Sequence, residues 1–164
     1  MTEAPVRSVD KIALLNQTFT GLADDELEEM AKVTQTCTYP PNHYLCYEGA
    51  YEDTFYIIAD GEVAITKKIS ETEGERELRK LGWGDFVGEM ALIQNAPRSA
   101  SVRTLTETTV LEMSKPNFES LLSRSPRMSL SIIRSTLARM RQNDQMAIQD
   151  LQRTNKVLRQ LDRN

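Results

Sequence analysis

The stretch FVGEMALIQNAPRSASV, residues 86–102, holds the most informative pattern in the sequence. Gly88 permits a close turn of the backbone, and the run MALI after it can form one helical turn. Exposed amides at such a helix start bind anions, and the guanidinium of Arg98 can donate two parallel hydrogen bonds to phosphate oxygens. Glu89 would repel a phosphate unless a hydroxyl lay between them, a place that a ribose hydroxyl fits. The stretch therefore predicts a site for a sugar phosphate.

The same stretch closely resembles the phosphate-binding cassette of the cyclic nucleotide-binding domain family. The family pattern is a GE-x-AL run followed by PR-x-A, and the sequence matches it without a gap at Gly88, Glu89, Ala91, Leu92, Pro97, Arg98 and Ala100. Upstream, LADDELEEMAKV resembles the family's N-terminal helix, and PPNHYLCYEG and FYIIADGEVAI resemble its first strands. The resemblance covers most of the chain.

The resemblance implies a role for each residue of the cassette. Glu89 accepts a hydrogen bond from the ribose 2′-hydroxyl, and Arg98 pairs with the cyclic phosphate. The remaining residues of the implied ligand site are Gly88, Met90, Ala91, Ser99 and Ala100. A surface ion pair between Glu89 and Arg98 is the alternative, and it would contribute about 0–1 kcal/mol. The complete cassette argues against that alternative.

Short apolar or alternating runs between residues 38 and 113 predict a β-rich domain. Apolar residues at helical spacing before them predict a helical region over 1–37, in which Asp24-Asp25-Glu26 begins a helix that runs to about Thr34. We predict an α+β fold, with an antiparallel β-roll of the double-stranded β-helix or jelly-roll type over 38–125.

A long helix is expected to follow the roll. Pro116 can open a short helix over Asn117 to Leu122, and Pro126 a second one that no Gly or Pro interrupts before Asn164. Two heptad rows run along residues 126–164: Leu130, Leu137, Asp144, Leu151 and Leu158, and Ile133, Met140, Ala147, Thr154 and Leu161. They predict a coiled coil of about five heptads, and hence a parallel homodimer. The alternative is an amphipathic helix that packs on its own domain.

Charge is distributed unevenly along the chain. The whole chain has 20 Lys and Arg against 24 Asp and Glu, so no overall basic field attracts nucleic acid or an anionic membrane. Residues 1–125 have 12 basic and 21 acidic side chains, and residues 126–164 have 8 and 3. The arginines of the C-terminal part are spread out, which disfavours a DNA-binding basic region.

Two cysteines and a start without an apolar segment indicate a reducing cytosol.

No enzymatic activity and no metal or cofactor are expected for this chain. His43 is the only histidine, which excludes a multi-histidine metal centre, and no other nucleophile stands beside a base. His43 follows Pro40-Pro41-Asn42 and is expected in a solvated loop. We expect a packing role, rather than a catalytic or binding role, for Cys37, Cys46 and Trp83.

We therefore expect a bacterial, cytoplasmic sensor that binds cAMP and transmits a change through the dimeric helix to an output domain outside this chain. A cGMP sensor is one alternative, and Ser99 is compatible with both nucleotides. A transcription regulator of the same family is another, although it needs a helix-turn-helix that this sequence does not contain.

Asn143 and Asp144 are the residues expected to approach the base. In an ungapped alignment they take the place where the long helix of a bacterial transcription activator of this family contacts adenine. Two facing copies of Asp144 in a coiled-coil core would be costly unless the N–H groups of a purine compensated for them. The alternative is a polar break that sets the coiled-coil register.

Overall fold

The computed structural model describes residues 10–88, 97–134 and 137–138. Before the roll lie the helices α1 (Lys11–Thr18) and α2 (Asp24–Lys32). The strands are β1 (Gln35–Tyr39), β2 (Tyr44–Cys46), β3 (Thr54–Asp60), β4 (Val63–Ser70), β5 (Gly74–Leu81), β6 (Phe86–Val87), β7 (Ser101–Thr104) and β8 (Thr108–Ser114). Helix α4 (Lys115–Arg124) follows them, and residues 126–134 and 137–138 are also helical.

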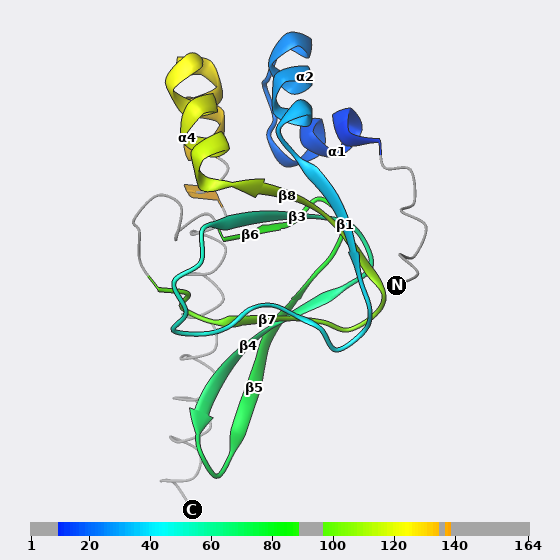
Figure 1. The fold of residues 1–164 in the computed structure, drawn as a ribbon, viewed down its shortest axis with the longest axis vertical. Coiled ribbons are helices and arrows are strands. Elements are labelled where there is room, and N and C mark those ends of the chain that lie inside the picture. Colours follow the sequence, from blue (N-terminus) through cyan, green and yellow to red (C-terminus); the bar gives the residue numbers. More distant parts are fainter. Residues whose placement is uncertain (1–9, 89–96, 135–136, 139–164) are drawn as a thin grey trace, which may run out of the picture.

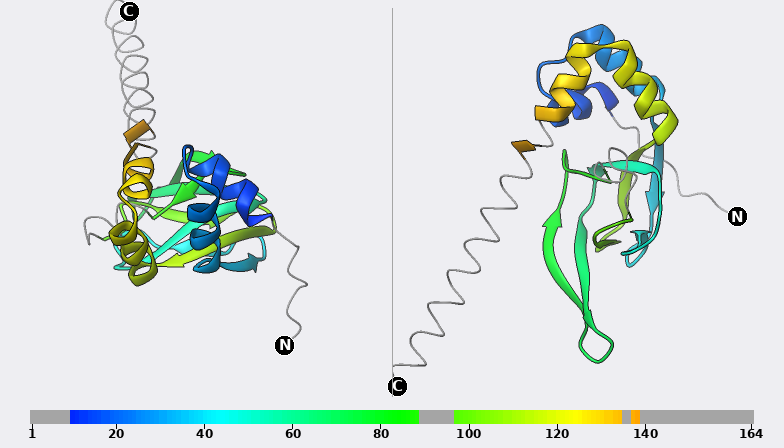
Figure 2. Two further views of the ribbon diagram at one scale, coloured as in Figure 1. Left: turned by 90° about the horizontal axis from the view of Figure 1, so that it is seen from above. Right: turned by 90° about the vertical axis from the view of Figure 1, so that its left-hand side faces the viewer.

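The strands form two antiparallel four-stranded sheets that face each other (Figure 1). The first has the order β1-β8-β3-β6 and the second the order β2-β7-β4-β5. The helices lie at one end of the molecule and the β4–β5 hairpin projects from the other (Figure 2). The predicted α+β class, with an antiparallel β-roll and N-terminal helices, is confirmed.

Strand β3 is buried on both faces, which explains its nearly continuous apolar sequence. Phe55 and Ile57 point to the core beneath the helices, whereas Tyr56 and Ile58 point to the core between the sheets. Side chains alternate between the two faces of a strand, so one run of residues supplies both cores.

Aromatic packing fixes the helices on the first sheet. Phe55 lies 6.1 Å from Phe19, 5.5 Å from Phe86 and 5.9 Å from Phe118, measured between ring centroids. Such tilted pairs add about 0.5–1.5 kcal/mol each beyond the burial of their area. Residues from the N-terminal helices, β3, β6 and α4 therefore share one cluster.

Two element boundaries differ from those expected. The roll begins at Gln35, because β1 pairs with β8 from Gln35 onward, and not at residue 38. Helix α4 spans Lys115–Arg124 and is longer than predicted, because Ser114 caps it by accepting a hydrogen bond from the Asn117 amide.

The start of the helix after Pro126 packs on its own domain through one face. Met128 and Ile132 are buried in the helical core. Leu130, Ile133 and Leu137, which belong to the predicted heptad rows, are 47–51% exposed. The part of the predicted coiled coil over 139–164, with Asn143 and Asp144, lies outside the described residues, and the coiled coil over 126–164 stays a prediction.

The packing expected for Trp83 is wrong, since its side chain is 56% exposed. Its turn is closed by hydrogen bonds from the Gly82 amide to the Asp85 carboxylate and from the Asp85 amide to the Gly82 carbonyl, which hold the ring at the surface. Cys46 is buried and Cys37 half-buried, as expected. His43 is exposed and stacks on Tyr39 at 4.6 Å, in agreement with a loop position.

Among the helices in the described part of the chain, none has the length and apolar character needed to span a membrane.

Candidate functional site

The backbone of Arg98 is fixed by the loop of residues 47–53, which joins β2 to β3. The Gly49 amide donates to the Arg98 carbonyl at 2.8 Å, and the Arg98 amide donates to the Ala50 carbonyl at 2.9 Å. Three residues after Arg98, the Ser101 hydroxyl accepts a hydrogen bond from the Glu48 amide at 2.8 Å. Two segments about fifty residues apart in sequence are thereby held side by side.

The side chain of Arg98 is buried, with 4% of its surface exposed. Its Nη2 donates to the carbonyl oxygen of Thr54 at 2.5 Å, and its Nε lies 3.8 Å from a carboxylate oxygen of Glu52. A distance of 3.8 Å makes an ion pair but no hydrogen bond. Within the described part of the chain, Nε and Nη1 therefore have no acceptor. Two nitrogen atoms of a buried cation thus lack an acceptor in the part of the chain that the structure describes.

Gly88 leaves the space that Arg98 occupies. It follows β6, has a φ of +96°, and a β-carbon at this position would lie 2.5 Å from Arg98 Nη1 and 2.6 Å from the Thr54 carbonyl oxygen. Only glycine combines this backbone conformation with so close an approach. The glycine of the cassette is therefore required by geometry.

The surroundings of Arg98 are poorly solvated. Burial raises the pKa of Cys46 to about 11 and that of Tyr56 to about 12. The positive charge of Arg98 lowers both pKa values and so opposes part of this increase. An effective dielectric constant well below that of water strengthens any charge interaction here. The arrangement suits the binding of an anion.

The structure brings Gly88 and Arg98 together, and their binding of a ligand stays a prediction. Ser99 is exposed and Ala100 half-buried directly after the arginine. Glu89, Met90 and Ala91 lie outside the described residues, as do Asn143 and Asp144. Their expected contacts with the ribose and the base stay predictions.

Two contacts of Arg98 were not anticipated from the sequence. Thr54 and Glu52 lie more than forty residues before the arginine and belong to no pattern that includes it. A hint is present in the sequence YED, residues 51–53, where acidic residues directly precede a buried strand. Only the pairing of the loop with the cassette gives them a partner.

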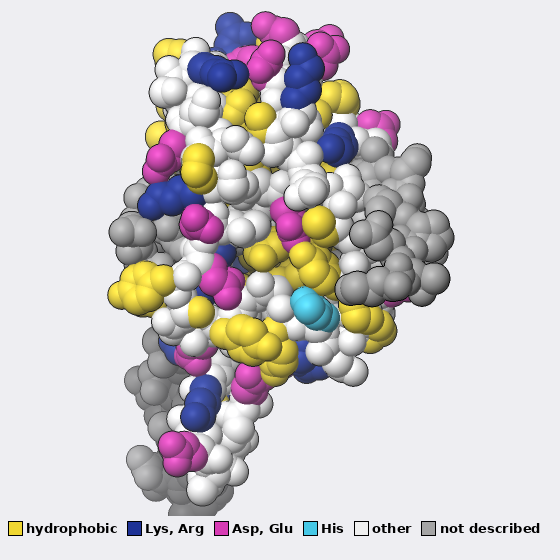
Figure 3. Space-filling model, viewed as in Figure 1, with side chains coloured by type: hydrophobic (Ala, Val, Ile, Leu, Met, Phe, Trp, Pro, Cys, Tyr) yellow, Lys and Arg dark blue, Asp and Glu magenta, His cyan; other side chains and the backbone are white. Residues whose placement is uncertain are grey.

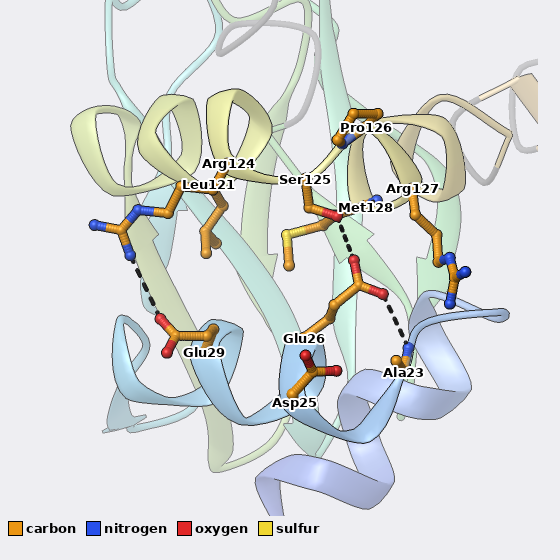
Figure 4. A pocket seen from close by; sticks show the side chains of 10 residues that line it. All are labelled: Ala23, Asp25, Glu26, Glu29, Leu121, Arg124, Ser125, Pro126, Arg127 and Met128. Carbon is orange, nitrogen blue, oxygen red and sulfur yellow. Dashed lines mark hydrogen bonds and ion pairs between the residues drawn. The ribbon is translucent and has the colours of Figure 1, made fainter.

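A separate cleft of about 570 Å³ lies between α2 on one side and the end of α4 and the start of the helix that begins at Pro126 on the other (Figure 4). There Glu26 accepts hydrogen bonds from the Ser125 hydroxyl and the Ala23 amide, and these bonds lower its pKa. Glu29 pairs with Arg124 at 3.4 Å. Charged side chains of both signs gather over the helices in Figure 3. Because Glu26, Glu29 and Arg124 already have partners, we interpret the cleft as part of a structural contact between α2 and the segment around Ser125, and not as a ligand site.

No group of three or more His, Cys, Asp or Glu residues in the described ranges is arranged to hold a metal ion. The chemistry that Arg98 and Gly88 offer is electrostatic recognition of an anion.

Comparison with known proteins points to one family. Its profile, the cyclic nucleotide-binding domain, matches residues 36–125, which is more than half of the chain. A cGMP-dependent protein kinase of Drosophila melanogaster, isozyme 2 forms cD5/T2, is 35% identical over 107 residues, which are 64% of this chain and 12% of the kinase.

Two solved structures are similar in fold. The catabolite activator protein of Thermus thermophilus has a TM-score of 0.71 and 28% identity, with 80% of this chain and 61% of that chain covered. The regulatory domain of Toxoplasma gondii PKA, crystallised with cAMP, has a TM-score of 0.63 and 27% identity, with 68% and 42% covered. This chain thus spans less than two thirds of each of these three proteins.

Proposed function

Because the chain belongs to the cyclic nucleotide-binding domain family, we propose that it binds a cyclic nucleotide, with the cyclic phosphate on Arg98 and without turnover of the ligand. The family match over residues 36–125 is the premise.

The unsatisfied donors of Arg98 carry the proposal. A buried guanidinium whose N–H groups have no acceptor is costly, because the charge and each donor have lost their water. A phosphate oxygen would satisfy Nε or Nη1, which have no acceptor among the described residues. Hydrogen bonds between charged partners in such surroundings are about twice as strong as neutral ones. The site is thus best suited to an anion with several acceptor oxygens.

Glu89 is proposed to bind the ribose 2′-hydroxyl, and amides near Met90, Ala91 and Ser99 to complete the phosphate cradle. This assignment rests on the cassette, in which Glu89 directly follows Gly88. A hydroxyl that donates to the carboxylate keeps Glu89 from repelling the phosphate.

We propose cAMP as the ligand. Asn143 and Asp144 would meet the purine edge, where the Asp144 carboxylate can accept a hydrogen bond from the adenine amino group. The solved PKA regulatory domain with cAMP supports this choice. cGMP is the second candidate, since guanine also presents donors to a carboxylate and the kinase relative is named as cGMP-dependent.

The helix that starts at Pro126 is proposed to transmit ligand binding as the seam of a parallel homodimer. Leu130, Ile133 and Leu137 are about half exposed at positions that repeat with heptad spacing. Burial against a second copy would remove their apolar surface from water. A two-state seam of this kind could act on two output domains together.

The output is proposed to lie outside this chain. An output enzyme is compatible with the kinase relative, of which this chain covers 12%, and a DNA-binding output with the catabolite activator protein, of which it covers 61%. The described residues favour neither.

Calorimetric titration of the chain with cAMP and cGMP tests the proposal. Arg98→Met should weaken binding by about 30-fold to several thousand-fold, because the phosphate charge loses its buried partner. Arg103→Met removes the same charge from β7, where Arg103 bonds Asn42 at 2.8 Å, and should leave affinity within a few-fold. Chromatography of the nucleotide after incubation should recover it intact. Equal affinity of the Arg98 variant and the parent protein would refute the site.

A further inference from the structure

The loop of residues 47–53 places a carboxylate beside the guanidinium of Arg98. Oε2 of Glu52 lies 3.8 Å from Nε, and the Glu52 side chain is 30% exposed whereas that of Arg98 is 4% exposed. The separation is too long for a hydrogen bond, and Nε has no acceptor among the described residues. Arg98 thus has a negative neighbour that leaves its donors available.

The charge of Glu52 also reaches the interior around Arg98. Burial is the main cause of the raised pKa values of Cys46 and Tyr56, and the negative charge of Glu52 adds to both. Arg98 opposes both increases. An anion on Nε or Nη1 would therefore interact with Glu52 as well as with Arg98.

We propose that Glu52 is a charge filter, meaning that its carboxylate makes the site accept a singly charged phosphodiester in preference to a doubly charged phosphomonoester. The inference rests on the proposed function and names a specificity-determining residue for that same site.

The argument follows from Coulomb's law, in which the energy is proportional to the charge of the ligand. A lone buried arginine would attract a dianion more strongly than a monoanion and would favour the monoester. A carboxylate close to the same position offsets this advantage. A terminal phosphate has a second pKa near 6, so at about pH 8 it is a dianion, whereas a cyclic phosphodiester keeps one charge.

The position of Glu52 makes this role specific. Glu48, on the same loop, directs its carboxylate to the Lys68 amide at 3.2 Å. Among the described residues, Glu52 is the carboxylate that pairs with Arg98.

The test compares cAMP with adenosine 5′-monophosphate by calorimetry at about pH 8, on the parent protein, Glu52→Gln and Glu28→Gln. Glu28 is exposed on α2 and provides the same change of charge away from the site. Glu52→Gln should tighten cAMP binding by about 3- to 10-fold and monophosphate binding by about 10- to 100-fold, because doubling the charge doubles the repulsion and squares the factor. Glu28→Gln should leave both affinities unchanged.

Each outcome decides the matter. If cAMP binds in an Arg98-dependent manner and Glu52→Gln leaves the ratio of the two affinities unchanged, the charge filter is overturned and the proposed function stands. If neither the parent nor the variant binds either nucleotide, both fail. Binding of the monophosphate by Glu52→Gln alone, with cAMP bound by both proteins, supports the filter in its extreme form. Should Glu52→Gln fold poorly in a urea titration, Glu52→Ser at the same half-buried loop position provides the same comparison.

Discussion

Gly88 and Arg98 approach each other so closely that a β-carbon on Gly88 would lie 2.5 Å from Arg98 Nη1. The contact joins the end of β6 to the buried cation, although ten residues separate the two positions in sequence. Any side chain at Gly88 therefore displaces the guanidinium from its position beside the Thr54 carbonyl.

Gly88→Ala should disturb both stability and ligand binding. A non-glycine residue at its φ of +96° costs about 1–3 kcal/mol, and the clash with Arg98 adds a loss of affinity of at least tenfold. Gly21→Ala is the matched control, because Gly21 has a φ of +91° and an added β-carbon there meets nothing within 4 Å. Urea denaturation and calorimetry measure the two effects. Similar affinity losses in both variants would contradict the steric role.

Ser125→Ala should lower the stability of the protein by weakening the contact between α2 and the helix that starts at Pro126. The Ser125 hydroxyl donates to Glu26 and accepts from the Met128 amide at 3.2 Å, so it caps that helix. Loss of such a cap lowers the free energy of unfolding by about 0.5–2 kcal/mol, a difference that urea denaturation can resolve. Ser123→Ala, at an exposed hydroxyl that bonds only within α4 in the described part, should cost much less.

The contact between α2 and the helix that starts at Pro126 should also weaken in acid. Hydrogen bonds from Ser125 and Ala23 lower the pKa of Glu26 below its ordinary 4.5. A lowered pKa stabilises the fold above the unfolded value and loses that contribution as pH falls through the folded value. The difference in unfolding free energy between the parent and Glu26→Gln should therefore shrink below about pH 4.5. A difference that is constant from neutral pH down to pH 3 would contradict this account.

Leu137→Glu should shift the protein from dimer to monomer in analytical ultracentrifugation. Leu137 is 51% exposed and would lie in the proposed seam, where two facing carboxylates are costly. Leu78→Glu, at a leucine of 50% exposure on β5, is the control and should leave the oligomeric state unchanged. A parent protein that is monomeric at high micromolar concentration, with or without nucleotide, would exclude the dimer.

Asp144→Leu should weaken cAMP binding if its carboxylate contacts the base. The loss of one hydrogen bond to a charged group corresponds to about 1.5–3 kcal/mol, or roughly 10- to 150-fold. Asp150→Leu, one position before the heptad residue Leu151, controls for the change of charge. Parallel titrations with cGMP test whether the effect depends on the base. Unchanged affinities together with a more stable dimer would assign Asp144 to coiled-coil register.

Much of the fold followed from local sequence patterns. The apolar run of β3 and the alternating runs around it predicted a β-roll, and the acid-rich start at Asp24 predicted α2, because side-chain periodicity and first-turn charges act within one element. The glycine and arginine of the cassette were found in the same way, since their spacing is itself the motif. The sequence therefore determined the fold class and pointed to two residues that the structure brings together, whose part in ligand binding stays a prediction.

Tertiary structure alone decided which partners these residues have. Glu52 and Thr54 meet Arg98 only because the loop of residues 47–53 pairs its backbone with the cassette. The exposure of Trp83 likewise depends on how its turn sits against the rest of the fold, which the residue's apolar character does not specify. Periodicity reports which face of an element is buried, but contacts between distant segments depend on the packing of whole sheets. That packing leaves Nε and Nη1 of a buried guanidinium without acceptors among the described residues, and the proposed anion site rests on this feature.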